Sequence, residues 1–184
     1  MIQVVVINGM GGVGKDAFVE ACRDDSPRDI YNLSMIDDVK NVALTIGWDG
    51  NKDEKGRTFL SNIKDALAEY CDYPYHMISE RIKEISEGYI DKDAIIFVHA
   101  REAHDIVRLV MDFHAFVLLI RRPSVEHEQV YTNHADLDVL EYHPYNYIYW
   151  NVGDMEKLKK DAKDFLHVVD FFGEKYGVEN EQDN

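Results

Sequence analysis

The fold is decided by the stretch Val4-Val5-Val6-Ile7-Asn8-Gly9-Met10-Gly11-Gly12-Val13-Gly14-Lys15-Asp16. The run of β-branched residues over 4–7 predicts a buried strand, and the pattern that begins at Lys15 predicts a helix to about Arg23. Between them lies the spacing G-x-x-x-x-G-K, with Asp16 in the position where Ser or Thr usually follows. A glycine-rich loop between a strand and a helix is the arrangement that wraps phosphate groups.

The residues of this loop have the properties that binding a nucleoside triphosphate requires. Glycine permits backbone conformations that bring N–H groups close to phosphate oxygens, and the following helix adds the positive end of its dipole. Lys15 supplies a cation for the β- and γ-phosphates, and Asp16 a hard oxygen ligand for Mg²⁺, directly or through water. The alternative for Asp16 is an acidic first-turn residue that stabilises the helix dipole. The sequence therefore predicts ATP and Mg²⁺ as cofactors, bound by Gly9, Gly11, Gly12, Val13, Gly14, Lys15 and Asp16.

Short apolar runs alternate with helical patterns along the rest of the chain. Further strands are predicted over residues 30–33, 94–98, 115–120 and 146–150. Helical spacing of apolar residues predicts helices over 36–46 behind an N-cap at Ser34, then over 60–71, 78–85 and 103–110, and a last helix capped by Asp154. Strands separated by helices indicate the α/β class, in three layers, with a five-stranded parallel sheet that binds ligands at the carboxyl ends of its strands.

Composition narrows the partners of the protein. The 184 residues carry 20 Lys and Arg against 35 Asp and Glu, a net charge of -15, so we expect neither nucleic acid nor an anionic membrane as a partner. The apolar start lacks the basic flank of a signal peptide, and no apolar run approaches the ~20 residues of a membrane span. We expect a cytoplasmic protein of one domain, with homodimer formation left open. Cys22 and Cys71 are predicted to be buried, reduced thiols.

The loop ending Gly14-Lys15-Asp16 resembles that of phage-type deoxynucleoside monophosphate kinases and of animal-type phosphomevalonate kinases. The resemblance continues through Arg101 after the third predicted strand, Arg121-Arg122-Pro123 after the fourth, and residues 151–154 before the closing helix. It implies the P-loop NTPase fold of nucleoside monophosphate kinases, as a single kinase domain over residues 1–184. Within that domain it implies a helical acceptor-binding insertion over about 34–88 and a lid over about 122–141.

The resemblance also implies roles for basic residues elsewhere in the chain. Two phosphorylated substrates repel each other, so an acidic protein needs local cations to bring them together. Outside the glycine loop, the plain alternative is a surface ion pair for an arginine and a solvated side chain for a lysine. The candidate catalytic residues are Lys15, Arg101, Arg121 and Arg122, the candidate acceptor-binding residues are Lys40, Arg57 and Arg101, and Asn151 is a candidate nucleotide contact.

One position departs from the pattern of these kinases. They place an Asp near Asp-x-Arg at the end of the third strand, whereas this chain has Val98-His99-Ala100-Arg101-Glu102. A neutral imidazole cannot hold hydrated Mg²⁺ as a carboxylate does, so Asp16 or Glu102 takes that role, or catalysis is impaired. A hydrogen bond from His99 to phosphate and a satisfied histidine at a strand end are both compatible with the sequence.

The glycine loop predicts an ATP- and Mg²⁺-dependent kinase. The resemblance implies that it phosphorylates the phosphate of a nucleoside monophosphate, with a deoxynucleotide as the favoured acceptor. Two alternatives within the enzyme class are another small phosphorylated metabolite, such as phosphomevalonate or dephospho-coenzyme A, and an unphosphorylated hydroxyl compound. A third alternative is a regulatory nucleotide-binding module with impaired catalysis. The expected partners are ATP and a small phosphorylated acceptor.

Overall fold

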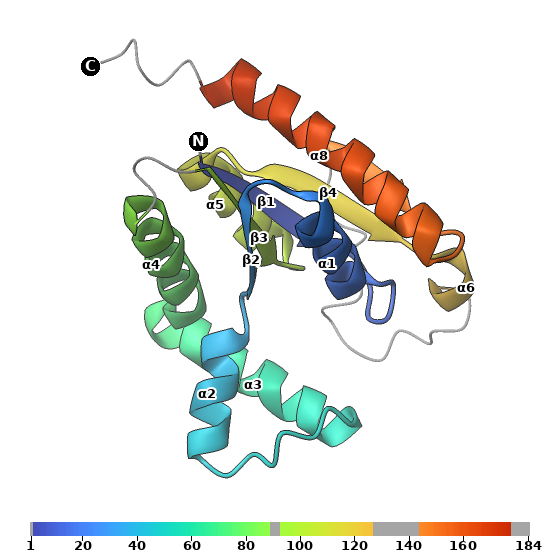
Figure 1. Cartoon of the computed structure of the whole chain (residues 1–184). Coiled ribbons are helices and arrows are strands. Elements are labelled where there is room, and N and C mark those ends of the chain that lie inside the picture. The colour runs from blue at the N-terminus through green and yellow to red at the C-terminus, as the bar shows by residue number, and fades with distance from the viewer. Residues whose placement is uncertain (1, 89–92, 127–143, 178–184) are drawn as a thin grey trace. The chain divides into compact units, whose positions relative to one another are not determined.

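The computed structural model describes residues 2–88, 93–126 and 144–177 (Figure 1). The chain forms two compact units, one made of Met1–Asn32 with Asp91–Asn184 and the other of Leu33–Ile90. The second unit spans the residues expected to bind the acceptor, and that role stays a prediction. Most of the predicted lid, residues 127–141, lies outside the described residues.

The sheet has five parallel strands: β1 (Ile2–Asn8), β2 (Asp29–Ser34), β3 (Ala94–His99), β4 (Phe116–Arg121) and β5 (Tyr147–Trp150). Their order is β2-β3-β1-β4-β5. Ile7 pairs with His99, and Asn8 pairs with Leu119, so the carboxyl ends of β1, β3 and β4 lie at one edge. This arrangement confirms the three-layer α/β fold with a five-stranded parallel sheet.

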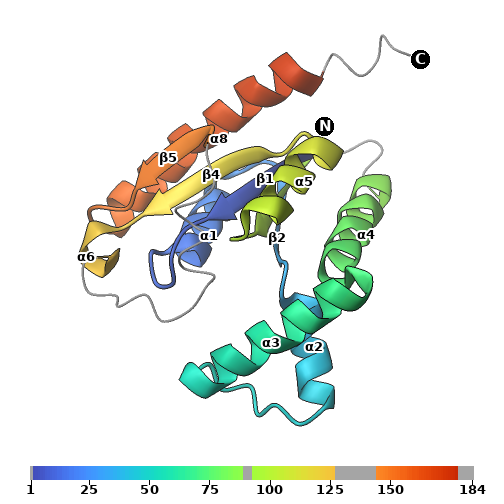
Figure 2. The ribbon, with the colours of Figure 1, turned by 180° about the vertical axis from the view of Figure 1, so that it is seen from behind.

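Helices cover both faces of this sheet. α1 (Lys15–Asp25) and α8 (Met155–Gly177) lie on one face and α5 (Ala103–Phe113) on the other, as the two opposite views show (Figures 1 and 2). Phe165 of α8 is fully buried, and its ring lies 5.3 Å from that of Phe18 in α1 and 5.8 Å from that of Phe116 in β4. This aromatic packing fixes α1, and with it the end of the glycine loop, against the sheet. None of the described helices combines the length and the apolar character that crossing a membrane requires.

The second unit consists of α2 (Asp37–Thr45), α3 (Glu54–Cys71) and α4 (Tyr73–Gly88). The predicted N-cap at Ser34 is wrong. Ser34 is still part of β2, its N–H donates to Asp37 Oδ2 over 2.9 Å, and the N-cap is Ile36. The helix predicted from residue 60 begins earlier, at Glu54, because the Asp53 side chain caps it.

Replacing Asp53 with Ala is expected to lower the free energy of unfolding by about 1 kcal/mol. The Gly56 N–H donates to Asp53 Oδ1 over 2.7 Å, and the substitution leaves this first-turn donor without its acceptor. Chemical denaturation measures the change. Asp65→Ala is the matched control, because Asp65 is exposed within the same helix and its removal changes the net charge equally. Equal stabilities of the two variants would show that the cap contributes nothing.

The two cysteines differ in exposure. Cys22 is buried, as predicted, whereas Cys71 at the end of α3 is exposed, so its predicted burial is wrong. Cys71 follows Leu60 by about three helical turns and so lies on nearly the same side of α3, but it is the last residue of the helix, beyond the residues that pack in this unit.

This difference predicts selective reaction with thiol reagents. Burial, and to a smaller extent the Asp25 charge, raises the pKa of the Cys22 thiol to about 12. Because the thiolate is the reactive form, a disulfide reagent at about pH 8 should modify one thiol in the native protein and two after denaturation. In the Cys71→Ser variant, no thiol should react in the native protein, and Cys22 should react after denaturation. Rapid modification of that variant in the native state would contradict the burial of Cys22.

Candidate active site

The loop between β1 and α1 has a backbone that needs glycine. Gly9, Gly12 and Gly14 have φ of 143°, 80° and 97°, a region that residues with a side chain rarely adopt. A Cβ on Gly9 would lie 2.5 Å from the backbone oxygen of Ile120 in β4. The loop therefore needs glycine at position 9 for its conformation and also for its close approach to the sheet.

Lys15 lies across the start of this loop. Its Nζ donates to the backbone oxygens of Gly9 and Met10 over 2.6 and 2.8 Å. Lys15 is also the first residue of α1, whose first-turn N–H groups have no partner within the helix. The loop thus combines an ammonium group with a helix N-terminus, which together favour an anion.

Two asparagines anchor the ends of the loop. Asn8 is fully buried, its Oδ1 accepts from the Gly9 N–H over 2.7 Å, and its Nδ2 donates to the Tyr145 hydroxyl over 2.9 Å. Asn151 Nδ2 donates to the Val13 backbone oxygen over 2.8 Å. Asn151, predicted as a nucleotide contact, therefore lies against the loop itself, and a contact with the nucleotide stays a prediction. Asn8 and Tyr145 were not singled out from the sequence, although a polar residue that ends an apolar strand is a recognisable signal.

Asp16 lies beside Asn32 and His99. Asn32 Nδ2 donates to Asp16 Oδ1 over 3.2 Å, His99 Nε2 lies 3.5 Å from the same oxygen, and His99 Nε2 is 2.7 Å from Asn32 Oδ1. The Asp16 side chain is 85% exposed. An exposed carboxylate next to Lys15 is a hard donor that fits Mg²⁺. His99 is hydrogen-bonded within the protein, and Asn32 is a contact that was not predicted from the sequence.

Arg121, the last residue of β4, and Arg122 after it both contact Glu126. Arg121 Nε lies 2.9 and 2.8 Å from the two carboxylate oxygens of Glu126, the last residue of α6 (Pro123–Glu126). The Arg121 guanidinium also lies 5.4 Å from the centre of the Trp150 ring. The Arg122 N–H donates to Glu126 Oε1 over 2.9 Å. Arg121 thus makes the ion pair that was the plain alternative for it, and transfer roles for Arg121 and Arg122 stay predictions.

Two further candidates, Arg101 and Glu102, lie between β3 and α5. Arg101 is half-buried. Glu102, the alternative Mg²⁺ ligand, lies with His104 and Asp105 at the start of α5, where one ligand atom from each comes within 4.8 Å of the others.

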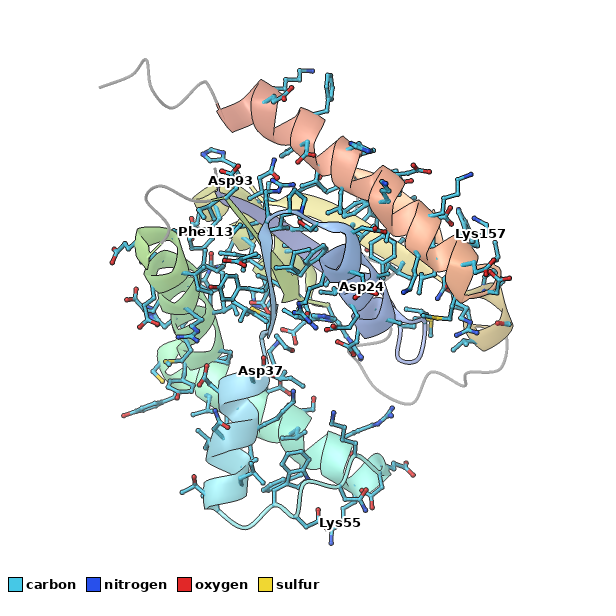
Figure 3. All side chains as sticks on the ribbon, in the orientation of Figure 1. Asp24, Asp37, Lys55, Asp93, Phe113 and Lys157 are labelled. Carbon is cyan, nitrogen blue, oxygen red and sulfur yellow. The ribbon has the colours of Figure 1, made fainter. Side chains whose placement is uncertain are left out.

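The two acceptor-binding candidates belong to the second unit. Lys40 pairs with Asp37, labelled in Figure 3, at 2.8 Å, and Arg57 Nε donates to the Lys52 backbone oxygen over 2.9 Å. Their parts in acceptor binding stay predictions.

Comparison with known proteins bears on the fold. No protein-family model matches the chain, and no curated protein matches it significantly. Three similar solved structures have a TM-score of 0.51. A shikimate kinase from Aquifex aeolicus is 12% identical, with 95% of this chain and 99% of that chain covered. The tunicamycin resistance protein of Deinococcus radiodurans and TT1252 of Thermus thermophilus are 10% and 13% identical, each with 90% of this chain and 96% of that chain covered. This chain therefore shares its three-layer α/β fold with these three proteins.

Proposed function

We propose that this protein is a cytoplasmic kinase that transfers the γ-phosphoryl group of ATP, with Mg²⁺, to a small phosphorylated acceptor. The observation that carries this proposal is the placement of Lys15, whose ammonium group lies on the carbonyls of a glycine loop at the N-terminus of α1. A strand-to-helix turn of purely structural purpose does not need a lysine there. Binding of a triphosphate accounts for the lysine, the glycines and the exposed Asp16 together.

Phosphoryl transfer asks the protein chiefly for positioning and for stabilisation of charge. The backbone N–H groups of the loop hold the β- and γ-phosphates, and Lys15 neutralises the charge that grows on them during transfer. Asp16 would hold Mg²⁺, directly or through water, and the ion supplies further positive charge to the phosphate oxygens. Arg101 and Arg122 are proposed to stabilise the negative charge on the transferred group. Arg121 is proposed to do the same when its ion pair with Glu126 breaks.

The proposed acceptor is a nucleoside monophosphate, with a deoxynucleotide favoured. The net charge of -15 repels such an anion over the molecule as a whole, so local cations have to select it. Lys40, Arg57 and Arg101 are the proposed contacts with its phosphate. Other phosphorylated metabolites and hydroxyl compounds remain competing acceptors, because acceptor specificity depends on residues outside the common fold.

A specific observation also favours a second candidate function, a regulatory nucleotide-binding module. His99 ends β3, where a carboxylate would help to hold Mg²⁺, and its Nε2 is 2.7 Å from Asn32 Oδ1. If Asp16 alone is too weak a ligand, ATP binds but transfer is slow. Nucleotide binding without transfer is the result that this candidate predicts.

A transfer assay over a panel of acceptors separates these functions. ADP formation from MgATP is followed together with the phosphorylated product of each ribo- and deoxynucleoside monophosphate, phosphomevalonate and dephospho-coenzyme A. Shikimate is included because one similar structure is named a shikimate kinase. We expect rapid transfer to one deoxynucleoside monophosphate. A bisubstrate analogue that joins ATP to this acceptor should raise Tm beyond the effect of MgATP, because it fills both sites.

Each outcome of this assay decides between the proposals. Transfer to a different member of the panel would keep the kinase and correct the acceptor. Stabilisation by MgATP without transfer to any acceptor would favour the regulatory module. Absence of both binding and transfer would reject the proposed function.

A further inference from the structure

The Asp16 carboxylate is held through one of its two oxygens. Asn32 Nδ2 and His99 Nε2 both approach Oδ1, at 3.2 and 3.5 Å. Within residues 2–88, 93–126 and 144–177, no hydrogen bond is made to Oδ2. A carboxylate that is fixed at one oxygen and open at the other is oriented as a monodentate ligand for a cation or for the water bound to it.

The direction of these hydrogen bonds follows from their chemistry. An ionised carboxylate only accepts, so the Asn32 amide turns its NH2 group toward Asp16. The amide oxygen of Asn32 then faces His99 Nε2 at 2.7 Å and, because it also only accepts, Nε2 carries a proton. His99 therefore donates to Asn32, and Asn32 donates to Asp16. Reversing either bond would leave two acceptors facing each other.

These two hydrogen bonds connect a residue at the end of a strand, His99, to a residue at the surface, Asp16. His99 is the last residue of β3, Asn32 lies in the neighbouring strand β2, and Asp16 lies in the first turn of α1. The His99 side chain is 15% exposed, whereas that of Asp16 is 85% exposed. A largely buried group thus limits the rotation of an exposed one, and an exposed aspartate otherwise loses rotamer freedom when it binds an ion.

We propose that Asn32 and His99 are positioning residues that hold Asp16 in the orientation in which it binds the Mg²⁺ that accompanies the nucleotide. Groups that hydrogen-bond to a metal ligand fix its direction and commonly strengthen metal binding. This inference rests on the proposed function and adds the residues that make one exposed carboxylate an effective ligand. It also gives His99 a purpose that differs from direct contact with the ion or with phosphate.

The test compares nucleotide binding with and without Mg²⁺, so it does not depend on turnover. Isothermal titration gives the Kd of ADP and of a non-hydrolysable ATP analogue in EDTA and in saturating Mg²⁺. The Kd in EDTA divided by the Kd in saturating Mg²⁺ measures the coupling between ion and nucleotide, and a larger ratio means stronger coupling. For Asn32→Leu and Asn32→Ala this ratio should fall about tenfold, with the Kd in EDTA unchanged.

Matched variants separate positioning from a general loss of structure. Asn41→Ala is the control, because Asn41 is an exposed asparagine that donates to a carboxylate oxygen of Asp38 at 3.5 Å outside the loop. His99→Leu removes the donor to Asn32 and should lower the ratio, whereas His99→Gln offers an amide N–H and should restore most of it. Asp16→Ala should lower the ratio at least as far, and adding Asn32→Leu to it should change nothing more.

Failure of this inference is distinguishable from failure of the proposed function. A ratio within twofold of the original in the Asn32 variants, or additive losses in the double variant, would overturn the positioning role even if the protein is a kinase. A wild-type protein that binds nucleotide equally with and without Mg²⁺ would overturn it as well. Normal coupling with the expected losses, but no transfer to any acceptor, would leave the positioning role intact and reject the kinase.

Discussion

Lys15→Ala is expected to lower the rate of phosphoryl transfer by about 10²- to 10³-fold, the usual effect of removing one preorganised group that stabilises transition-state charge. The Lys15 ammonium lies on the carbonyls of Gly9 and Met10, within the loop that is proposed to hold the phosphates. Without it, the negative charge that develops on the transferred group is opposed only by the loop N–H groups, Mg²⁺ and the proposed arginines. The loss should appear mainly in kcat, because the charge grows as the reaction proceeds.

The measurement is a steady-state transfer assay with the best acceptor of the panel, together with thermal unfolding of each variant. Lys159→Ala is the control, because Lys159 is an exposed lysine of α8 whose pair with Asp24, at 3.0 Å, lies on the surface. It should keep both its activity and its Tm, since such pairs contribute little to stability. Transfer by Lys15→Ala at the original rate would remove the glycine loop from the proposed active site.

Gly9→Ala is expected to lower the free energy of unfolding by roughly 3 kcal/mol and to abolish nucleotide binding. A Cβ at this position would lie 2.5 Å from the backbone oxygen of Ile120, and φ is 143°. Because the clashing atom belongs to the backbone of β4, it cannot move aside as the end of a side chain would. Relief requires the loop to move away from β4, which also displaces the carbonyls that hold Lys15.

Gly12→Ala is the matched control for this prediction. It lies in the same loop and also has a positive φ, 80°, but among the described residues its Cβ would meet only a side-chain carbon of Val125 at 3.5 Å, an ordinary contact. We expect Gly12→Ala to lower the free energy of unfolding by about 1 kcal/mol, which is the cost of placing a residue with a side chain at a positive φ. Denaturant unfolding of both variants isolates the effect of the close approach at Gly9. Equal losses would mean that the contact with Ile120 is accommodated without strain.

The fold and the centre of the site could be predicted because their signals are local. A continuous apolar run such as 94–98 is typical of a strand that is buried on both faces. The spacing from Gly9 to Lys15 can be recognised within one short segment, without knowledge of any long-range contact. Helix limits were predicted less accurately, because capping depends on single side chains. The Asp53 cap starts α3 at Glu54, earlier than predicted, and Ser34, predicted as an N-cap, is the last residue of β2.

Residue order along the chain was therefore sufficient for the α/β class, the parallel sheet and the position of the glycine loop, since each depends on periodicity within one segment. Tertiary structure decided what surrounds that loop. Asn32 and His99, which are 67 positions apart, meet because β2 and β3 are neighbours in the sheet, and Asn151 reaches Val13 only through the order of the strands. Hydrogen bonds between distant segments depend on how the strands are arranged, and residue type and spacing do not encode that arrangement locally.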